Sequence, residues 1–259
     1  PCVGEAKRLQ AHIRRSRKCL RFDKSRGCFV DTETARKYRG VTTTARRVFY
    51  KNYVYQSPGP SSTPKKKGQR GVTGTTRGSL VDTQLSDWAD ANDGSKKNPS
   101  KPPHAYAHKI AKALIKFGLT PIAGQIPVFD EDLRIGTAVD MVCYHERESR
   151  LVLCEIKCGW NGNAYEKASG GMHSAMRGFD NSPSNQHQIQ LAMTHYLFGV
   201  TFGTMEHESY VVRATDGGVY FYELSPKVLD RIGLISSAIA EAKCERRSKK
   251  FRRKKAKSK

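Results

Sequence analysis

The sequence has few acidic residues and no long apolar run. Against 46 lysines and arginines there are only 24 aspartates and glutamates, so the net charge is +22 and the isoelectric point is near 9.9. A basic surplus of this size favours a polyanionic partner, because Lys and Arg that neutralise phosphates release counterions. No stretch approaches the roughly 18 apolar residues of a membrane span, and no basic amphipathic helix carries aromatic anchors. We therefore expect nucleic acid as the partner and no membrane.

Paired cysteine motifs and a secretion signal are missing as well. The seven cysteines are scattered without a C-x-x-C pair, which argues against a zinc module and against an extracellular disulfide scaffold. The N-terminal segment lacks the apolar centre of a signal peptide. It begins with Pro1 instead of Met, which indicates a fragment or a processed product, and its arginines also suit a transit peptide. These features predict a reducing, intracellular compartment.

Basic segments flank a more regular centre. Residues 1–76 are expected to form a basic arm and linker, and residues 57–78 are rich in Pro, Gly, Ser and Lys. Within the arm, the aromatic and basic stretch 44–56 either stacks on nucleic acid or anchors the arm to the core. Residues 244–259 form a basic tail with two clusters that resemble a nuclear-localisation signal and also suit binding to a phosphate backbone. The expected location is nuclear, with mitochondria or a viral factory as alternatives.

The centre, residues 77–243, shows apolar periodicity and is long enough for a substantial core. Helical spacing predicts helices over residues 79–90, 105–117 and 185–200, and a last helix that opens at Ser225-Pro226. Extended patterns predict strands over residues 121–129, 136–145, 151–159, 209–215 and 218–224. The strands over 136–145 and 151–159 are joined by a short charged turn, so we expect them to form an antiparallel hairpin.

One predicted strand, LVLCEIKCG at 151–159, carries charges inside an apolar run. Residues two apart share a face of a strand, so Glu155 and Lys157 lie side by side. Asp140 lies on the preceding strand, and a hairpin that pairs the strand centres brings all three together. Because burying charge is costly, such a cluster indicates chemistry more than stability. Two carboxylates and the carbonyl of Ile156 form a hard-oxygen site for Mg²⁺ or Mn²⁺, and Lys157 can orient or help deprotonate a water that attacks a phosphodiester.

The tripeptide acid-x-Lys is by itself a weak signal. It occurs also at residues 5–7 and 241–243, where the surroundings are polar, basic and helical in character. Only the copy at residues 155–157 lies in an apolar strand and follows an Asp-bearing strand. The alternative interpretation is a surface Glu–Lys pair across neighbouring strands, which would contribute little to stability.

The run RIGTAVDMVCYHERESRLVLCEIKCGW, residues 134–160, resembles the core of the PD-(D/E)xK nucleases, and most closely the RecB and λ-exonuclease type that includes viral alkaline nucleases. The likeness extends over about residues 77–225. It implies an α/β fold with a restriction-endonuclease-like core, in which helices flank a mixed central sheet. It also implies that Asp140 and Glu155 are metal ligands and Lys157 is the catalytic lysine. In the helix QIQLAMTHYLF, Gln190 would steady the site or a DNA phosphate.

The sequence departs from this pattern at several positions. Asp82 stands where the branch often has a His, and it either replaces that ligand or lies on a helix surface. Gln125 stands where a Glu is frequent and Thr194 where a Tyr is expected, so one-metal, two-metal and inactive sites all stay open. The C-terminal cysteines of the iron–sulfur members are absent, and no cluster is expected.

Histidines and cysteines offer weaker candidates. His104 and His108 lie one helical turn apart, but without an acidic partner an ordinary helix surface is the commoner arrangement. His187 either faces the predicted site or lies on a polar helix surface. Cys154 and Cys158 flank the motif and are expected to be small core residues, because no His/Asp arrangement would activate them.

These patterns together predict a Mg²⁺- or Mn²⁺-dependent nuclease that hydrolyses DNA phosphodiester bonds without sequence preference. No separate recognition module is evident, which favours an exonuclease in replication, recombination or repair. One alternative is a catalytically weak or inactive nuclease-fold protein that binds nucleic acid or builds a nucleoprotein particle. A further alternative is a structure-specific endonuclease or resolvase. The sequence does not decide between single- and double-stranded DNA as the partner, and it does not give the oligomeric state.

Overall fold

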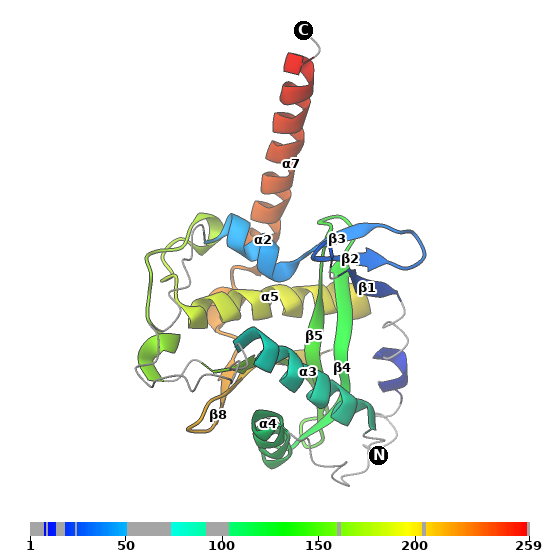
Figure 1. Ribbon diagram of the computed structural model, residues 1–259, viewed down its shortest axis with the longest axis vertical. Helices are drawn as coiled ribbons and strands as arrows, with labels where there is room; N and C mark the ends of the chain where they lie inside the picture. The colour runs from blue at the N-terminus through cyan, green and yellow to red at the C-terminus, as the bar shows by residue number, and fades with distance from the viewer. Residues whose placement is uncertain are drawn as a thin grey trace, which may run out of the picture.

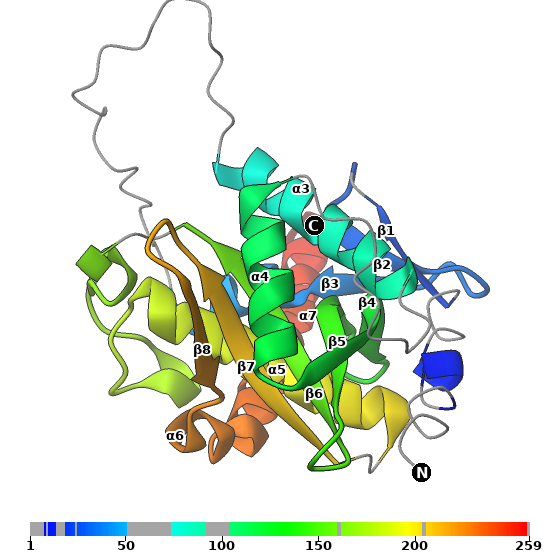
Figure 2. The same ribbon diagram turned by 90° about the horizontal axis from the view of Figure 1, so that it is seen from below.

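The computed structural model describes residues 8, 10–13, 19–23, 25–50, 74–91, 104–159, 162–203 and 206–257. Within these ranges the side chains of residues 74–76, 162–163 and 246–257 are not described. The predicted linker up to residue 73 and most of the first 18 residues lie outside the described part. The described residues form a mixed central sheet with helices on both faces, as Figures 1 and 2 show.

The sheet contains eight strands within the described part of the chain. They are β1 (Leu20–Asp23), β2 (Cys28–Asp31), β3 (Lys37–Gly40), β4 (Leu119–Asp130), β5 (Ile135–His145), β6 (Arg150–Cys158), β7 (His207–Ala214) and β8 (Val219–Glu223). Their order is β1-β2-β3-β5-β6-β7-β8, and β4 pairs with β5. The β3–β5 and β6–β7 pairs are parallel, whereas the others are antiparallel. All five predicted strands and the β5–β6 hairpin are confirmed.

The segment that the sequence predicts to be an arm contributes to this same sheet. Strands β1 to β3 extend it, and β3 pairs with the first residues of β5. The helix α2 (Val41–Val48) follows β3, and the next residues, Phe49 and Tyr50, are buried in the core. In the described residues, the aromatic stretch therefore anchors this segment, and residues 51–56 lie outside the description. The predicted boundary at residue 77 does not separate the described N-terminal elements from the core.

The remaining helices are α3 (Gly74–Ala91), α4 (Ala105–Lys116), α5 (Pro183–Phe202), α6 (Pro226–Leu229) and α7 (Ile232–Lys257). Helix α4 ends as predicted before Gly118, whose φ of +83° suits glycine. Helix α3 begins at Gly74, five residues before the expected start. The predicted last helix is interrupted: α6 is a single turn, and Asp230 and Arg231 form a turn before α7 begins. The basic tail continues α7 as helix, and α7 projects from the body of the molecule (Figure 1).

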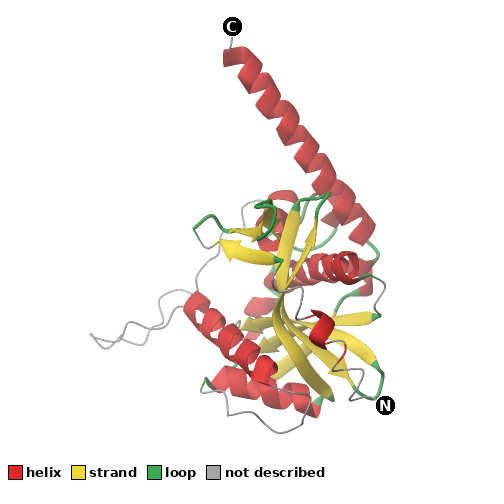
Figure 3. Ribbon diagram, turned by 90° about the vertical axis from the view of Figure 1, so that its right-hand side faces the viewer, coloured by secondary structure: helices red, strands yellow, loops and turns green. Residues whose placement is uncertain are grey.

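Helices cover both faces of the sheet (Figure 3), and an apolar core lies on each face. Helices α3 and α4 pack on one face around residues such as Trp88, Ile110 and Met141. Helices α2, α5 and α7 pack on the other face. Helix α5 is apolar on more sides than one stripe predicts, because it is enclosed by the sheet and the neighbouring helices. In the described part of the chain, no helix is both long and apolar enough to cross a membrane.

The sheet forks at β5, and this fork positions the predicted site. Strand β4 follows β5 along one edge. On the other edge, β3 pairs only with Ile135 and Gly136, whereas β6 pairs only from Met141 onward. Residues 137–140 lie between these two partners. A side chain at this point can reach backbone groups that would otherwise belong to a continuous ladder.

Candidate functional site

Asp140 occupies the fork between β5 and β6. It is the last residue of β5 before the pairing of Met141 with Cys154. One carboxyl oxygen, Oδ2, accepts a hydrogen bond of 2.8 Å from the backbone N–H of Ile156. The other oxygen, Oδ1, accepts from Nε2 of Gln125 at 3.4 Å. The carboxyl group thus takes the place of a ladder acceptor, which holds it firmly where the two strands separate.

Glu155 and Lys157 extend from the part of β6 that β5 no longer covers. Their side chains form an ion pair with 2.6 Å between Oε1 and Nζ. Only 11% of the Glu155 side chain and 19% of the Lys157 side chain are exposed. The pair lies within one strand and is largely buried, so it differs from the surface cross-strand pair of the alternative interpretation. Removing an ion pair from water to this extent costs free energy, so a role in stability alone does not explain it.

Asp82 approaches the same place from helix α3. The helix packs closely on β4, since a Cβ atom at Gly124 would lie 2.7 Å from the Cα atom of Ser86. Glycine at position 124 therefore permits the approach. Burial raises the pKa of Asp82 to about 6; the charge of Lys157 opposes this shift and that of Glu155 adds to it. The charges of Glu155 and Lys157 therefore act on Asp82. We call Asp82, Asp140, Glu155 and Lys157 the carboxylate cluster.

The carboxylate cluster carries more negative than positive groups. Burial raises the pKa of Asp140 well above its usual value, and the nearby charges of Glu155 and Asp82 raise it further. Burial alone would lower the pKa of Lys157, but the carboxylates of Glu155 and Asp140 outweigh burial and raise it. A single ammonium thus faces three carboxyl groups. An additional cation would relieve this repulsion, and carboxylate oxygens are the ligands that Mg²⁺ and Mn²⁺ prefer.

The geometry of the cluster does not by itself define a metal site. Within the described ranges, no three His, Cys, Asp or Glu side chains are grouped so that they could hold a metal ion. The predicted ligands are two carboxylates, from Asp140 and Glu155, and the backbone carbonyl of Ile156, with Asp82 as a further ligand. The backbone N–H of Ile156 bonds Asp140, and its side chain packs among apolar residues. The donor chemistry fits a hard divalent ion, and the metal remains a prediction.

Gln190 lies in α5 and contacts Tyr50, which follows α2. Its Nε2 atom is 3.5 Å from the hydroxyl oxygen of Tyr50, a long hydrogen bond. Burial raises the pKa of Tyr50, whereas the contact with Gln190 and the charges of Arg46 and Lys157 lower it. Tyr50 therefore lies near the carboxylate cluster. The sequence analysis missed its role, because only its place in the aromatic stretch 44–56 singled it out.

His187 is half-buried in α5, and the charge of Lys157 acts on it. Burial lowers its pKa well below the usual value, and the charges of Lys157 and Arg213 lower it further. Its Nδ1 atom is 3.3 Å from the hydroxyl of Tyr165, and the guanidinium of Arg213 stacks 4.2 Å from the centre of the Tyr165 ring. Arg213 is the register partner of Lys157 in the β6–β7 pair, so the Arg213–Tyr165 stack and His187 belong to the neighbourhood of Lys157. Tyr165 and Arg213 gave no signal in the sequence, because they come from separate elements.

Two other histidines, His104 and His195, make structural contacts. The ring nitrogen Nδ1 of His104 accepts from the backbone N–H of Tyr106 and caps α4. His195 lies 3.0 Å from the hydroxyl of Ser209 and packs against His207.

The two cysteines beside the motif are also structural. Cys154 is buried in the core, as expected. Burial raises the pKa of Cys158 to about 12, so this thiol stays protonated and is no nucleophile. Thr194, where the family pattern has a Tyr, donates its hydroxyl to the carbonyl of Gln190 within α5.

No model of a known protein family matches the chain, and no curated protein matches it either. The case for a function is therefore made from the geometry of the fork and from the charge of the chain.

Proposed function

We propose that the protein is a metal-dependent nuclease of the PD-(D/E)xK type, with a restriction-endonuclease-like core. One observation carries the proposal. Asp140 on β5, and Glu155 and Lys157 on β6, meet at the point where these strands separate. Three acidic groups around a buried lysine form an expensive arrangement that a structural role does not require.

A divalent cation would be held by Asp140, Glu155 and the carbonyl of Ile156, with Asp82 as the additional ligand. When bound, Mg²⁺ or Mn²⁺ offsets the charge of a phosphodiester and makes a bound water more acidic. Lys157 is kept protonated by Glu155 and Asp140, so it acts as a donor that orients the attacking water and stabilises developing negative charge.

Gln190 supplies a neutral donor from α5. The Gln190 amide lies in α5 and donates a long hydrogen bond to the hydroxyl of Tyr50. An amide at this place can hold a phosphate oxygen of the substrate without adding charge. We therefore assign Gln190 and Tyr50 to substrate positioning.

DNA is the proposed substrate, because the chain carries a charge of +22 while the acids Asp140 and Glu155 gather with Lys157 in the fork. Basic groups would bind the phosphate backbone without reading sequence. This suits an exonuclease acting in replication, recombination or repair better than a site-specific enzyme. The unusual Asp82 and Gln125 keep the inactive DNA-binding protein as the second candidate function.

The test uses the purified chain with linear and closed-circular DNA, each with Mg²⁺, Mn²⁺ or EDTA. We expect metal-dependent shortening of the linear DNA and an intact circle. Nicking or linearisation of the circle would instead identify an endonuclease. Retardation of both DNAs without cleavage under every metal condition would contradict the nuclease and leave the binding protein. An Asp140→Asn variant serves as the control for contaminating nucleases.

A further inference from the structure

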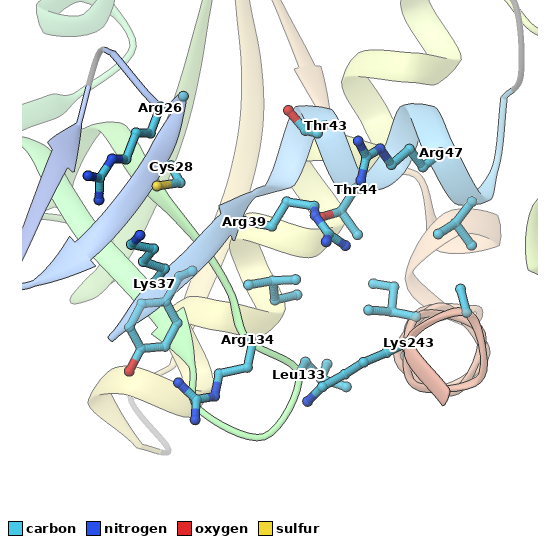
Figure 4. A pocket seen from close by; sticks show the side chains of 16 residues that line it. Arg26, Cys28, Lys37, Arg39, Thr43, Thr44, Arg47, Leu133, Arg134 and Lys243 are labelled. Atoms are coloured by element: carbon cyan, nitrogen blue, oxygen red, sulfur yellow. The ribbon is translucent and has the colours of Figure 1, made fainter. Parts of the chain in front are cut away.

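A second charged site lies at the start of β5. A pocket of about 380 Å³ is lined by residues of the β1–β2 turn, β2, β3, α2, the β4–β5 turn, β5 and α7. Six of the lining side chains are basic: Arg26, Lys37, Arg39, Arg47, Arg134 and Lys243. We call this site the basic pocket. Figure 4 shows these labelled side chains around one hollow, and Lys243 extends from α7 toward Leu133.

No acidic side chain lines the basic pocket. The acids close by have other partners: Asp23 receives the backbone N–H groups of Ser25 and Arg26, and Glu131 pairs with Arg36 at 2.8 Å, although Arg26 also lies 3.5 Å from Asp23. Six like charges that share one hollow repel each other, and this repulsion is relieved when an anion binds.

Polar side chains also line the pocket between the basic ones. Tyr38 lines it and is completely buried, yet its hydroxyl has no hydrogen-bond partner among the described residues. Such buried polar groups are uncommon in folded proteins. The hydroxyl-bearing side chains of Thr43 and Thr44 line the same hollow, and Thr44 donates to the carbonyl of Gly40. Arg134 has a φ of +53°, a strained value for a residue with a side chain.

The pocket lies between the carboxylate cluster and the end of α7, so one extended ligand could contact all three. Ile135 at the pocket and Asp140 in the fork lie on the same strand, five residues apart, which corresponds to roughly 17 Å. This separation equals about five phosphate steps along one strand of a B-form duplex. Beyond Lys243, the helix α7 continues, and the sequence places basic residues at helical spacing in line with it: 246, 247, 250, 253, 254 and 257.

We propose that the basic pocket binds backbone phosphates of a nucleic-acid strand that continues along α7. The proposal rests on the proposed function only in taking nucleic acid as the ligand, and it does not require cleavage. Arginine guanidinium groups and lysine ammonium groups provide the charge-assisted hydrogen bonds for the phosphate oxygens. Contacts of this kind position the substrate and leave its sequence unread. A small free anion with phosphate groups shares this chemistry, so the test separates the two sources.

The test measures DNA binding in EDTA, where no cleavage takes place. Arg47→Gln with Arg134→Gln removes two charges from the pocket and touches no residue of the carboxylate cluster. Lys112→Gln with Lys116→Gln removes two charges from exposed positions of α4 and is the matched control. Fluorescence anisotropy with a labelled 30-mer duplex and single strand, from 50 to 300 mM salt, gives affinity and salt slope. Melting temperatures show that each variant is folded.

We expect the pocket variant to bind at least about tenfold more weakly and to lose roughly 1.8 from the slope of log affinity against log salt, since each phosphate contact contributes about 0.9. The control variant should stay within about twofold of the unaltered protein. Equal effects of the two variants would overturn the proposal, because the loss would then reflect net charge. Unchanged DNA binding, with loss of pyrophosphate binding in calorimetry, would also overturn it and identify a small-anion site. If the unaltered protein cleaves no DNA but the two variants still differ in DNA binding as expected, only the proposed nuclease activity would be refuted.

Discussion

The carboxylate cluster and the basic pocket share strand β5, through Asp140 and Ile135, and they handle charge in opposite ways. The carboxylate cluster is enclosed, so its groups influence each other strongly and the pKa values of Asp82 and Asp140 rise. The basic pocket is open, and Lys37, Arg39, Arg47 and Arg134 remain exposed to water. Enclosed charge is specific, because it demands one compact counter-ion with the correct geometry. Hydrated charge of one sign suits a long polyanion in any sequence and register.

The largest effect is expected from a substitution that changes only the carboxylate cluster. Lys157→Ala should reduce metal-dependent DNA cleavage by at least about a thousandfold, because a donor to the developing charge acts mainly in the transition state. Binding of DNA in EDTA should change by less than about twofold, since the basic pocket is untouched. Single-turnover cleavage and anisotropy measure the two quantities, and Lys112→Ala is the control. Cleavage at the wild-type rate by Lys157→Ala would remove the catalytic assignment.

The next largest effect concerns Asp82, which should make the unfolding free energy of the protein depend on pH. Its pKa in the folded protein is about 6 against an ordinary value of 3.8, so the folded state binds more protons between these values. Stability must therefore fall as pH rises from about 4 to about 7. A shift of about two units corresponds to up to roughly 3 kcal/mol, and Asp140 contributes in the same direction.

Asp82→Asn should flatten this profile and raise the unfolding free energy at pH 7, measured by urea denaturation at several pH values. Mn²⁺ should stabilise the wild type at pH 7 more than the variant, and cleavage by the variant should fall severely if Asp82 is a ligand. An unchanged pH profile in Asp82→Asn would show that the residue is solvated, as on an ordinary helix surface. Activity within a few-fold of wild type would exclude it as an essential ligand.

Removing residues 244–259 tests how much the exposed basic charge contributes to DNA binding. The truncation keeps Lys243, and thus the basic pocket, but deletes the projecting end of α7. DNA affinity at 0.15 M salt should fall on the order of tenfold and the salt slope should decrease, whereas cleavage at low salt should persist. An unchanged salt slope would mean that this segment serves targeting or another partner.

Tyr50→Phe should give the smallest effect. The change removes the hydroxyl that contacts Gln190 at 3.5 Å and leaves the packing of the ring intact. Because this hydrogen bond is long, we expect a loss of about two- to fivefold in cleavage and less than about 1 kcal/mol in stability. Gln190→Ala should cost more than Tyr50→Phe, and the double variant should equal Gln190→Ala if Tyr50 acts through Gln190. Additive losses would show that the two residues act independently.

Local patterns in the sequence were sufficient for the elements and for the position of the motif. Alternation in residues 151–159 placed Glu155 and Lys157 on one face, and the short turn before them predicted the hairpin with β5. These features depend on neighbours within about twenty residues, for which periodicity and turn chemistry are informative. The break between α6 and α7 was missed, because the competition between one long helix and a turn is decided by packing against the sheet.

The tertiary structure alone decided how distant segments share β5. Nothing in the residues of β3 shows that it pairs in parallel with Ile135 and Gly136 and thereby opens the fork at Asp140. The contact between Tyr50 and Gln190 spans 140 positions, and the basic pocket gathers residues from the β1–β2 turn to α7. The sequence by itself determined the charges and their local faces. Which charges meet depended on long-range strand pairing and core packing, because the free energy of those contacts is shared among residues that lie far apart in the chain.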